Sequence, residues 1–438
     1  MRAGLEVVFY TQWLKLQRSQ WFDRERLECL QLKALRRVVR HAFLTVPFYR
    51  ELYKTTKIDP LSLRSLRELE RLPMVSKEHL RATPIQDRLS SEFSQHECYT
   101  RRTSGSTGQP VEILEEPLAL DFMRAYQLRR ILSYGFLPWE KIVVLDPRRV
   151  DKPAKGHGFR NPLTKMLPGG GLYHVPMGTP REQLDAIRRL RPRGIWALPS
   201  AMRSIGSLLS EGDPKQLNLR AILSWGELLD RGTREFVETR YGASIFDGYG
   251  AVEVAPLGGL AWECGHHGFH TNADCVVLEF VKDGERVSCE ERGEVVATSL
   301  YRYAMPAIRY KLYDYAVPSD ETCSCGRGFP LLKSLEGRKV DCLVAENGEL
   351  VSPFRVIVAL EEIGQVGRYQ IVQEERGHLV VRIEALSAVP QETVDEIVRV
   401  SKSLVGEGMR ITVEASPSLS PQPGAKFQPV VCKIQKSL

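Results

Sequence analysis

Short apolar runs alternate with helical patterns through the middle of the chain, and this alternation limits the fold more than any other feature. Residues 142–145, 194–198 and 221–224 have the length and apolar content of buried strands. Helical segments separate them, and one begins at residues 179–182, where Thr-Pro-Arg-Glu matches a helix start. Strands that alternate with helices usually form a parallel sheet. We therefore predict an α/β fold with a largely parallel core sheet.

The two ends of the chain have a different character. Helical periodicity covers residues 20–55, 61–72, 119–134 and 201–211, whereas the Gly- and Pro-rich residues 146–172 indicate a long loop. Further β segments are expected at 276–280, 293–298 and 308–310. The end of the chain predicts strands at 369–372, 379–383 and 410–413 and a helix at 392–404. We predict a large domain with mixed β-sheets and helices over residues 1–337, a hinge at 337–341, and a small α+β domain over 338–438.

Composition narrows the class of protein. The chain has 438 residues and is 43% hydrophobic, which is enough for two or more domains. A net charge of +7 is small for this length, and the basic clusters have helical spacing, so we expect no nucleic acid partner, although the charge favours an anionic ligand. We expect no membrane span, no signal peptide and a cytoplasmic location. The nine cysteines then argue against a disulfide framework.

Residues 103–110, Thr-Ser-Gly-Ser-Thr-Gly-Gln-Pro, combine hydroxyl side chains with glycines between two expected strands. Glycine allows backbone N–H groups to approach a ligand closely, and N–H groups with hydroxyls suit phosphate oxygens. The segment lacks the Gly-Lys-Ser/Thr end of a Walker loop, and a flexible turn is the alternative interpretation. The residues that would contact the phosphate are Thr103, Ser104, Gly105, Ser106, Thr107 and Gly108.

Residues 247–253, Asp-Gly-Tyr-Gly-Ala-Val-Glu, follow a short expected strand. The ring of Tyr249 is suited to stack on a base, and the carboxylate of Glu253 is suited to bind Mg²⁺. An ordinary loop with a solvated Glu is the alternative.

Two further residues carry chemistry that suits a nucleotide. Asp314 follows an expected strand, where a carboxylate can accept hydrogen bonds from ribose hydroxyls, although Asp also forms turns. Lys426 lies near a Gly close to the C-terminus and could act as a mobile cation for a phosphate, although most such lysines are solvated.

A group of cysteines and histidines predicts a metal site. Three thiolates and one imidazole make a closed tetrahedral site, which is typically a structural zinc site. The Cys-x-Cys spacing is tighter than usual, so unliganded cysteines are an equal alternative from spacing alone. The set is Cys264, His270, Cys323 and Cys325, with His266 and His267 as alternative ligands.

Taken together and in this order, the segments resemble the adenylate-forming (acyl-adenylate) superfamily, and within it the phenylacetate–CoA ligase-like branch. The resemblance spans nearly the whole chain and includes residues 46–49 and 72–77. The matching motifs are residues 103–110 (phosphate loop), 224–227 (adenine-facing segment), 247–253 (aromatic-Gly-x-Thr-Glu), 305–314 (Pro-x-x-Arg-Tyr…Asp), 337–338 (Gly-Arg) and Lys426 (adenylation lysine).

The resemblance implies an AMP-forming carboxylic acid ligase. Such an enzyme converts a small carboxylic acid and ATP into an acyl-adenylate, which a thiol, coenzyme A in most cases, then attacks. It implies that Lys426 and Glu253 are catalytic, that Glu253 holds Mg²⁺, and that the Cys/His set holds Zn²⁺. It also implies that the domain over residues 338–438, which carries Lys426, is mobile. The residues implied in ATP and AMP binding are Thr103, Ser104, Gly105, Ser106, Thr107, Gly108, Gly226, Glu227, Asp247, Tyr249, Gly250, Asp314 and Arg338.

The chain departs from the family pattern at three positions. Val252 replaces the Thr before Glu253, Tyr313 stands where a Gly usually precedes Asp314, and Ala425 separates Gly424 from Lys426. None of these changes removes a charged group.

Other functions are compatible with the sequence. The acceptor could be an amine or a carrier instead of coenzyme A, as in an amide-forming ligase or an adenylyltransferase. A nucleotide-binding scaffold protein is the non-enzymatic alternative. We expect the acid pocket between the phosphate loop and residues 200–253, with Trp225 and Tyr249 as an apolar wall. The oligomeric state is open, with a homodimer as one option.

Overall fold

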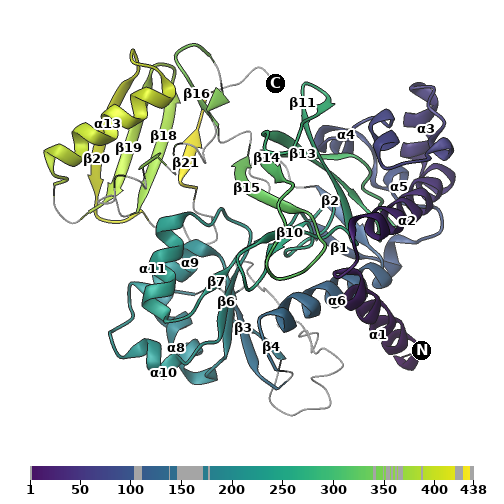
Figure 1. The fold of residues 1–438 in the computed structure, drawn as a ribbon, viewed down its shortest axis with the longest axis horizontal. Helices are drawn as coiled ribbons and strands as arrows, with labels where there is room; N and C mark the ends of the chain where they lie inside the picture. Colours follow the sequence, from purple (N-terminus) through teal and green to yellow (C-terminus); the bar gives the residue numbers. More distant parts are fainter. Residues whose placement is uncertain are drawn as a thin grey trace. The chain divides into compact units, whose positions relative to one another are not determined.

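The computed structural model divides the chain into two units, drawn in Figure 1. Unit 1 contains Met1–Phe136 and Phe246–Ser334, and unit 2 contains Leu137–Ile245 and Leu335–Leu438. The structure describes residues 2–102, 111–137, 139–145, 171–175, 178–338, 342–348, 350–351, 356, 359–360, 363, 368–385, 388–419 and 428–434.

Unit 1 begins with helices and ends with a large antiparallel sheet. Asp23 caps α2 by accepting a hydrogen bond from the backbone N–H of Arg26, and Pro47 starts the next helix. The helices are α1 (Arg2–Ser19), α2 (Arg24–Thr45), α3 (Pro47–Thr55), α4 (Lys77–Ala82), α5 (Ile85–Arg88) and α6 (Pro117–Ser133), with 3₁₀ turns η1 (Pro60–Ser62), η2 (Arg67–Arg71) and η3 (Gln95–Glu97).

Eight strands form the large sheet in the order β12-β11-β13-β14-β15-β10-β9-β8, and its described pairings are antiparallel. These strands are β8 (Gly248–Tyr249), β9 (Ala261–Glu263), β10 (Phe269–Thr271), β11 (Val276–Lys282), β12 (Glu285–Arg286), β13 (Gly293–Ser299), β14 (Tyr310–Ser319) and β15 (Leu331–Arg338). A separate hairpin pairs β1 (Tyr99–Arg102) with β2 (Glu112–Glu115).

Unit 2 contains the parallel sheet that the alternating pattern predicts. Its order is β4-β3-β5-β6-β7, and the pairings of β3 with β4 and β5 and of β5 with β6 are parallel. An apolar core joins these strands to the neighbouring helices. The elements are β3 (Lys141–Leu145), β4 (Gly171–Val175), α8 (Pro180–Leu190), β5 (Gly194–Ala197), α9 (Pro199–Gly206), α10 (Asp213–Leu217), β6 (Ala221–Ser224), α11 (Arg231–Tyr241) and β7 (Ile245–Phe246).

The end of the chain forms a small α+β layer with a core of its own. Four strands have the order β20-β19-β18-β21, and α13 packs beside them. The elements are β16 (Leu343–Val344), β17 (Leu350–Val351), β18 (Tyr369–Glu375), β19 (His378–Glu384), α13 (Gln391–Val405), β20 (Arg410–Ser416) and β21 (Val430–Cys432). These elements agree with the predicted strands and helix. The domain boundary at residue 337 and the mobility of the second domain stay predictions.

Three local expectations were wrong. The predicted helix at 61–72 is replaced by two short 3₁₀ turns, η1 and η2, with residues 63–66 between them. The end of the expected loop at 146–172 belongs to β4, whose first residue is Gly171, and residues 146–170 lie outside the described residues. The expected strand at 308–310 begins only at Tyr310.

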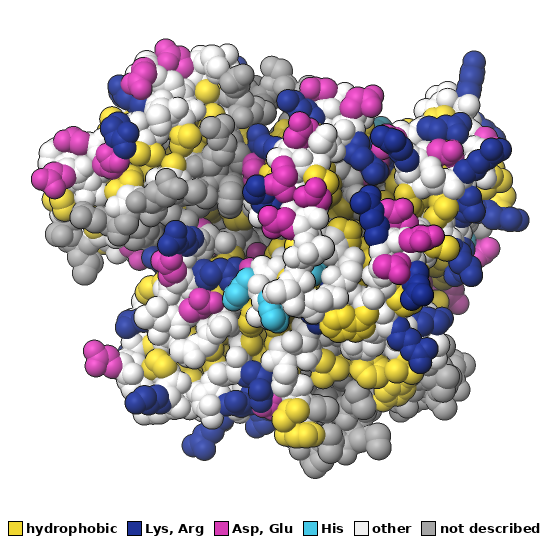
Figure 2. Space-filling view, viewed as in Figure 1, with side chains coloured by type: hydrophobic (Ala, Val, Ile, Leu, Met, Phe, Trp, Pro, Cys, Tyr) yellow, Lys and Arg dark blue, Asp and Glu magenta, His cyan; other side chains and the backbone are white. Residues whose placement is uncertain are grey.

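The structure also shows how charged side chains are distributed on one face, and whether any described helix could span a membrane. On the face shown in Figure 2, Lys and Arg side chains lie interspersed with Asp and Glu. In the described parts of the chain, no helix combines the length and the apolar character needed to cross a membrane.

Candidate active site

The predicted phosphate loop joins the two strands of the β1–β2 hairpin. The strands pair antiparallel from Tyr99 with Glu115 to Arg102 with Glu112, as expected of a loop between strands. Residues 103–110 themselves, including Thr103 to Gly108, lie outside the described residues. Their contact with phosphate therefore stays a prediction.

Tyr249 and Asp314 come together although they lie far apart in the sequence. Tyr249 is on β8, and its hydroxyl donates a hydrogen bond of 2.6 Å to Oδ2 of Asp314 on β14. The Tyr249 side chain is buried, with 8% of its surface exposed. The residues predicted for adenine and ribose are thus direct neighbours.

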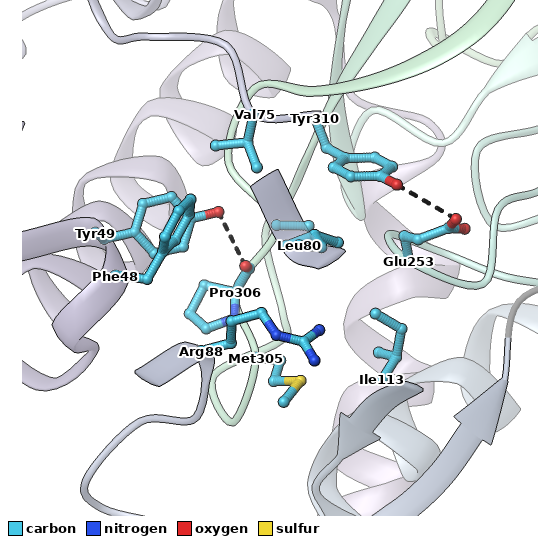
Figure 3. Close-up of a pocket in the computed structure, with 11 residues that line it drawn as sticks. Phe48, Tyr49, Val75, Leu80, Arg88, Ile113, Glu253, Met305, Pro306 and Tyr310 are labelled. Atoms are coloured by element: carbon cyan, nitrogen blue, oxygen red, sulfur yellow. Dashed lines mark hydrogen bonds between the residues drawn. The ribbon is translucent and has the colours of Figure 1, made fainter. Parts of the chain in front are cut away.

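Glu253 lies in the same unit, beside a pocket that Figure 3 shows. The hydroxyl of Tyr310, the first residue of β14, donates a long hydrogen bond of 3.4 Å to Oε1 of Glu253. Burial, followed by the charge of Glu253, raises the pKa of Tyr310 above its ordinary value, so the phenol keeps its proton. The pocket is mostly apolar and is lined by Phe48, Tyr49, Val75, Leu80, Arg88, Ile113, Glu253, Met305, Pro306, Ala307 and Tyr310.

The donor set at Glu253 fits Mg²⁺. Magnesium is usually held by one or two carboxylates together with substrate phosphates and water. A single carboxylate at the edge of a pocket, with a weak hydrogen bond as its described contact, meets this requirement.

Gly250 explains why the motif needs a glycine between Tyr249 and Glu253. A Cβ at this position would come within 2.7 Å of the backbone N of Leu257 and 2.9 Å of the backbone O of Ala255. Backbone atoms cannot move aside as a flexible side chain can, so the turn excludes larger residues here.

Asp247 is held by the strand that pairs with β8. Its backbone N–H donates a hydrogen bond of 2.7 Å to Oε2 of Glu263, and its own Oδ1 accepts one of 2.8 Å from the N–H of Gly248. The side chain is 9% exposed. These contacts fix the start of the motif, and a direct contact of Asp247 with nucleotide stays a prediction.

Gly226 and Glu227 belong to unit 2. Gly226 has φ of 78°, a conformation that favours glycine. The carboxylate of Glu227 accepts hydrogen bonds of 2.9 Å from both the N–H and the hydroxyl of Ser200 in the first turn of α9. This position suits an acidic side chain, because the helix N-terminus carries partial positive charge. Binding of nucleotide by this pair stays a prediction.

Two predicted residues are described little or not at all. Arg338 is the last residue of β15, and its side chain lies outside the description. Lys426, the predicted adenylation lysine, falls in residues 420–427, which are not described.

Tyr313 has a strained backbone at the point where the family usually has Gly. Its φ is 58°, which is uncommon for a bulky residue. Its hydroxyl donates a hydrogen bond of 2.7 Å to Oε2 of Glu78 on α4, and burial, followed by that hydrogen bond, raises the pKa of Tyr313 to about 12. The strand that carries Asp314 is thereby tied to an N-terminal helix. The sequence showed the departure from Gly but not its partner.

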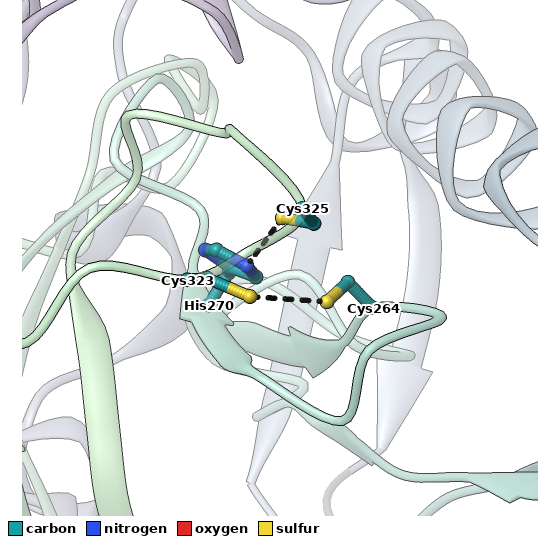
Figure 4. A group of neighbouring side chains, drawn as sticks. All are labelled: Cys264, His270, Cys323 and Cys325. Atoms are coloured by element: carbon teal, nitrogen blue, oxygen red, sulfur yellow. Dashed lines mark hydrogen bonds between the residues drawn. The ribbon is translucent and has the colours of Figure 1, made fainter.

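The predicted metal ligands form one cluster, drawn in Figure 4. Their ligand atoms lie within 4.8 Å of one another, with Cys264 Sγ 3.6 Å from Cys323 Sγ and Cys325 Sγ 3.2 Å from His270 Nε2. Tetrahedral zinc with bonds of about 2.3 Å to sulfur and about 2.0 Å to nitrogen separates its ligands by about 3.5–3.8 Å. His270 Nδ1 donates to the carbonyl of Phe329 at 3.2 Å, which leaves Nε2 for a metal. The residues therefore fit zinc.

The alternative metal ligands take other partners. His266 Nδ1 lies 3.1 Å from the hydroxyl of Ser324, and His267 Nδ1 lies 3.8 Å from Oε1 of Glu263. His270 is thus the imidazole of the cluster in the structure.

Comparison with known proteins bears on the class of protein. No family model matches the chain. Phenylacetate-coenzyme A ligase of Thermus thermophilus is 29% identical over 370 residues, which cover 81% of this chain and 80% of that protein. Phenylacetate-coenzyme A ligase of Escherichia coli is 27% identical over 370 residues, which cover 81% of each chain.

A solved structure shows the same fold. A 2-hydroxyisobutyryl-CoA ligase in the postadenylation state, in complex with R3-HIB-AMP, matches with a TM-score of 0.80 at 21% identity, over 95% of this chain and 91% of that chain. The fold and the motifs together define this chain as an adenylate-forming enzyme. Within that superfamily, the likeness to two phenylacetate-coenzyme A ligases supports the phenylacetate–CoA ligase-like branch that the sequence predicted.

Proposed function

We propose that this protein uses ATP to activate a carboxylic acid as an acyl-adenylate and then transfers the acyl group to coenzyme A. One observation carries the proposal. The hydrogen bond of 2.6 Å between Tyr249 and Asp314 joins the residues predicted for adenine and ribose, and Gly250 connects that pair to Glu253. The two relatives, which are named phenylacetate-coenzyme A ligases, support coenzyme A as the acceptor of the acyl group.

In the first step, a carboxylate oxygen attacks the α-phosphorus of ATP, and pyrophosphate leaves. Both reactants are anions, so the site must offset negative charge. Mg²⁺ held by Glu253 would neutralise part of the triphosphate charge. Lys426 would bridge the acid and the α-phosphate, and Thr103 to Gly108 would hold the other phosphates. Asp314, assisted by Arg338, would bind the ribose while Tyr249 stacks on adenine.

In the second step, the thiol sulfur of coenzyme A attacks the acyl carbon, the thiol proton is released, and AMP leaves with the electron pair of the acyl–oxygen bond. We propose that residues 338–438 move between the two steps about a hinge at residues 337–341.

We also propose that Cys264, His270, Cys323 and Cys325 hold a structural Zn²⁺ that ties the loop before β10 to the loop before β15. Metal analysis of the purified protein should find about one zinc per chain, and Cys323→Ser should lower both the zinc content and the melting temperature. A wild-type protein without zinc, together with a Cys323→Ser variant of unchanged stability, would disprove the site.

A cytoplasmic location is part of the proposal. The nine cysteines, all among the described residues, form no disulfide, and zinc thiolates, ATP and coenzyme A are all compatible with a reducing compartment.

The test of the function is a screen for pyrophosphate release over aryl, alkyl and amino acids, with coenzyme A, with an amine, or with neither. We expect one acid class to release pyrophosphate and to consume coenzyme A. Glu253→Gln should slow release by about 10²-fold, and Lys426→Ala should abolish acid-dependent exchange but spare transfer from preformed acyl-adenylate. No release with any acid would refute adenylation, and release that depends on an amine would refute the coenzyme A assignment.

A further inference from the structure

A fully buried arginine joins two segments of unit 1 that the proposed chemistry requires to be close. Arg302 and Glu115 have fully buried side chains, and Nη2 of Arg302 lies 3.3 Å from Oε1 of Glu115. Nη1 of Arg302 donates a hydrogen bond of 2.7 Å to the backbone carbonyl of Val252. The other oxygen of Glu115 accepts a hydrogen bond of 2.5 Å from Nε of Arg101.

The backbone around Arg302 is fixed by the next carboxylate along the chain. Oε1 of Glu116 accepts a hydrogen bond of 2.7 Å from the N–H of Tyr303, and Oε2 accepts one of 3.1 Å from the N–H of Ala304. Consecutive carboxylates at the end of β2 therefore bind the side chain of Arg302 and the backbone that follows it.

The two ends of this network have defined places in the proposed site. Arg101 and Glu115 lie on β1 and β2, the strands that flank the predicted phosphate loop. Val252 directly precedes Glu253, the predicted Mg²⁺ ligand. The guanidinium thus connects the base of the phosphate-loop hairpin to the segment that carries Glu253.

Stability alone is a weak reason for this arrangement. Burying an ion pair removes both charges from water, and apolar residues of similar volume are often equally stable in its place. Nε of Arg302 makes no hydrogen bond with any described residue, which adds to the cost. Arg302 differs from an apolar residue in its ability to hold Glu115 and the Val252 carbonyl in one fixed geometry.

We propose that Arg302 is a positioning residue, which fixes Glu253 relative to the phosphate-loop hairpin so that Mg²⁺ and the triphosphate bind together. This inference rests on the proposed function. Arg302 itself contacts neither ligand in the proposal, and it acts through Val252 and Glu115.

The test compares Arg302→Lys with a matched control, Arg129→Lys. Arg129 is also a buried arginine, with 1% of its side chain exposed and an ion pair of 2.5 Å to Asp274, and its described partners include neither the hairpin nor residues 252–253. Calorimetry measures the affinity for a non-hydrolysable ATP analogue with and without Mg²⁺. The ratio of the two affinities is the gain that the metal supplies. We expect Arg302→Lys to reduce this gain by about tenfold and Arg129→Lys to leave it within about twofold of wild type.

A double mutant separates positioning from general damage. In a Glu253→Gln background the gain from Mg²⁺ is already lost, so Arg302→Lys should reduce it no further. If Arg302→Lys fails to fold, Arg101→Lys replaces it, because that side chain is 22% exposed, and a smaller loss of the gain is expected. An unchanged gain in the folded variant overturns the role of Arg302, whereas an unchanged gain in Glu253→Gln alone overturns the metal role of Glu253 in the proposed function.

Discussion

The contact between Tyr249 and Asp314 can be tested by removing a single oxygen atom, the hydroxyl of Tyr249, and measuring the affinity for ATP. Tyr249→Phe removes the hydroxyl that donates a hydrogen bond of 2.6 Å to Oδ2 of Asp314, and it keeps the ring that we expect to stack on adenine. A hydrogen bond to a charged group contributes about 1.5–3 kcal/mol. If the bond serves to orient Asp314 for ribose, its loss should weaken ATP binding by about 10- to 150-fold.

The assay is calorimetric titration of the protein with Mg-ATP, with melting temperature as a check on folding. Tyr310→Phe is the matched control, because it also deletes one phenol hydroxyl. That hydroxyl lies 3.4 Å from Oε1 of Glu253, which is longer than a usual O–H···O hydrogen bond. We expect less than about a threefold effect from the control. Unchanged ATP affinity in a folded Tyr249→Phe protein, or a larger loss in Tyr310→Phe, would refute the assignment of Asp314 to ribose.

Three further changes test the local geometry. Gly250→Ala should cost about 1–3 kcal/mol in urea unfolding, because its Cβ would meet backbone atoms at 2.7–2.9 Å, whereas Gly265→Ala, with nothing within 4 Å, should be neutral. Gly268→Ala should lower zinc content, because its Cβ would lie 2.5 Å from a thiolate sulfur of the cluster, and full zinc occupancy would contradict this. Burial acts to raise the pKa of Glu78, but hydrogen bonds from Tyr313 and Ser76 outweigh it and lower the pKa below 4.5, so this stabilisation is present above pH 4.5 and is lost as pH falls through the lowered value. Tyr313→Phe should therefore destabilise by about 0.5–1.5 kcal/mol at pH 7 and by less on acidification, as followed by urea unfolding at each pH, and an equal loss at all pH values would contradict the pairing.

The local sequence pattern predicted most helices and strands correctly, but it failed for two short segments. The parallel strands β3, β5 and β6 were predicted because buried strands keep short apolar runs between helix signals. The segment 61–72 was assigned the wrong helix type, because periods of 3 and 3.6 differ little over so few residues. Strand β4 was missed because only one of its five residues is β-branched, and it follows a Gly-rich segment.

The candidate site shows a similar division. Residue type led to the prediction of Glu253, Tyr249 and Asp314 as site residues, because bases, ribose and metals each require a particular functional group. The sequence did not indicate the pairing of Arg302 with Glu115, because residue type alone does not show whether two charged side chains form a buried ion pair or are solvated separately.

The amino-acid sequence by itself therefore determined the order of the motifs, the alternation of strands and helices, and the resemblance to adenylate-forming enzymes that the relatives support. Folding was needed to choose partners for the side chains. Asp314 meets Tyr249 across 65 positions, Cys264 meets Cys323 across 59, and Arg302 meets the Val252 carbonyl across 50. Periodicity reports only on neighbours within a few residues, whereas contacts at such separations depend on how whole strands pair and on which buried polar groups must be satisfied.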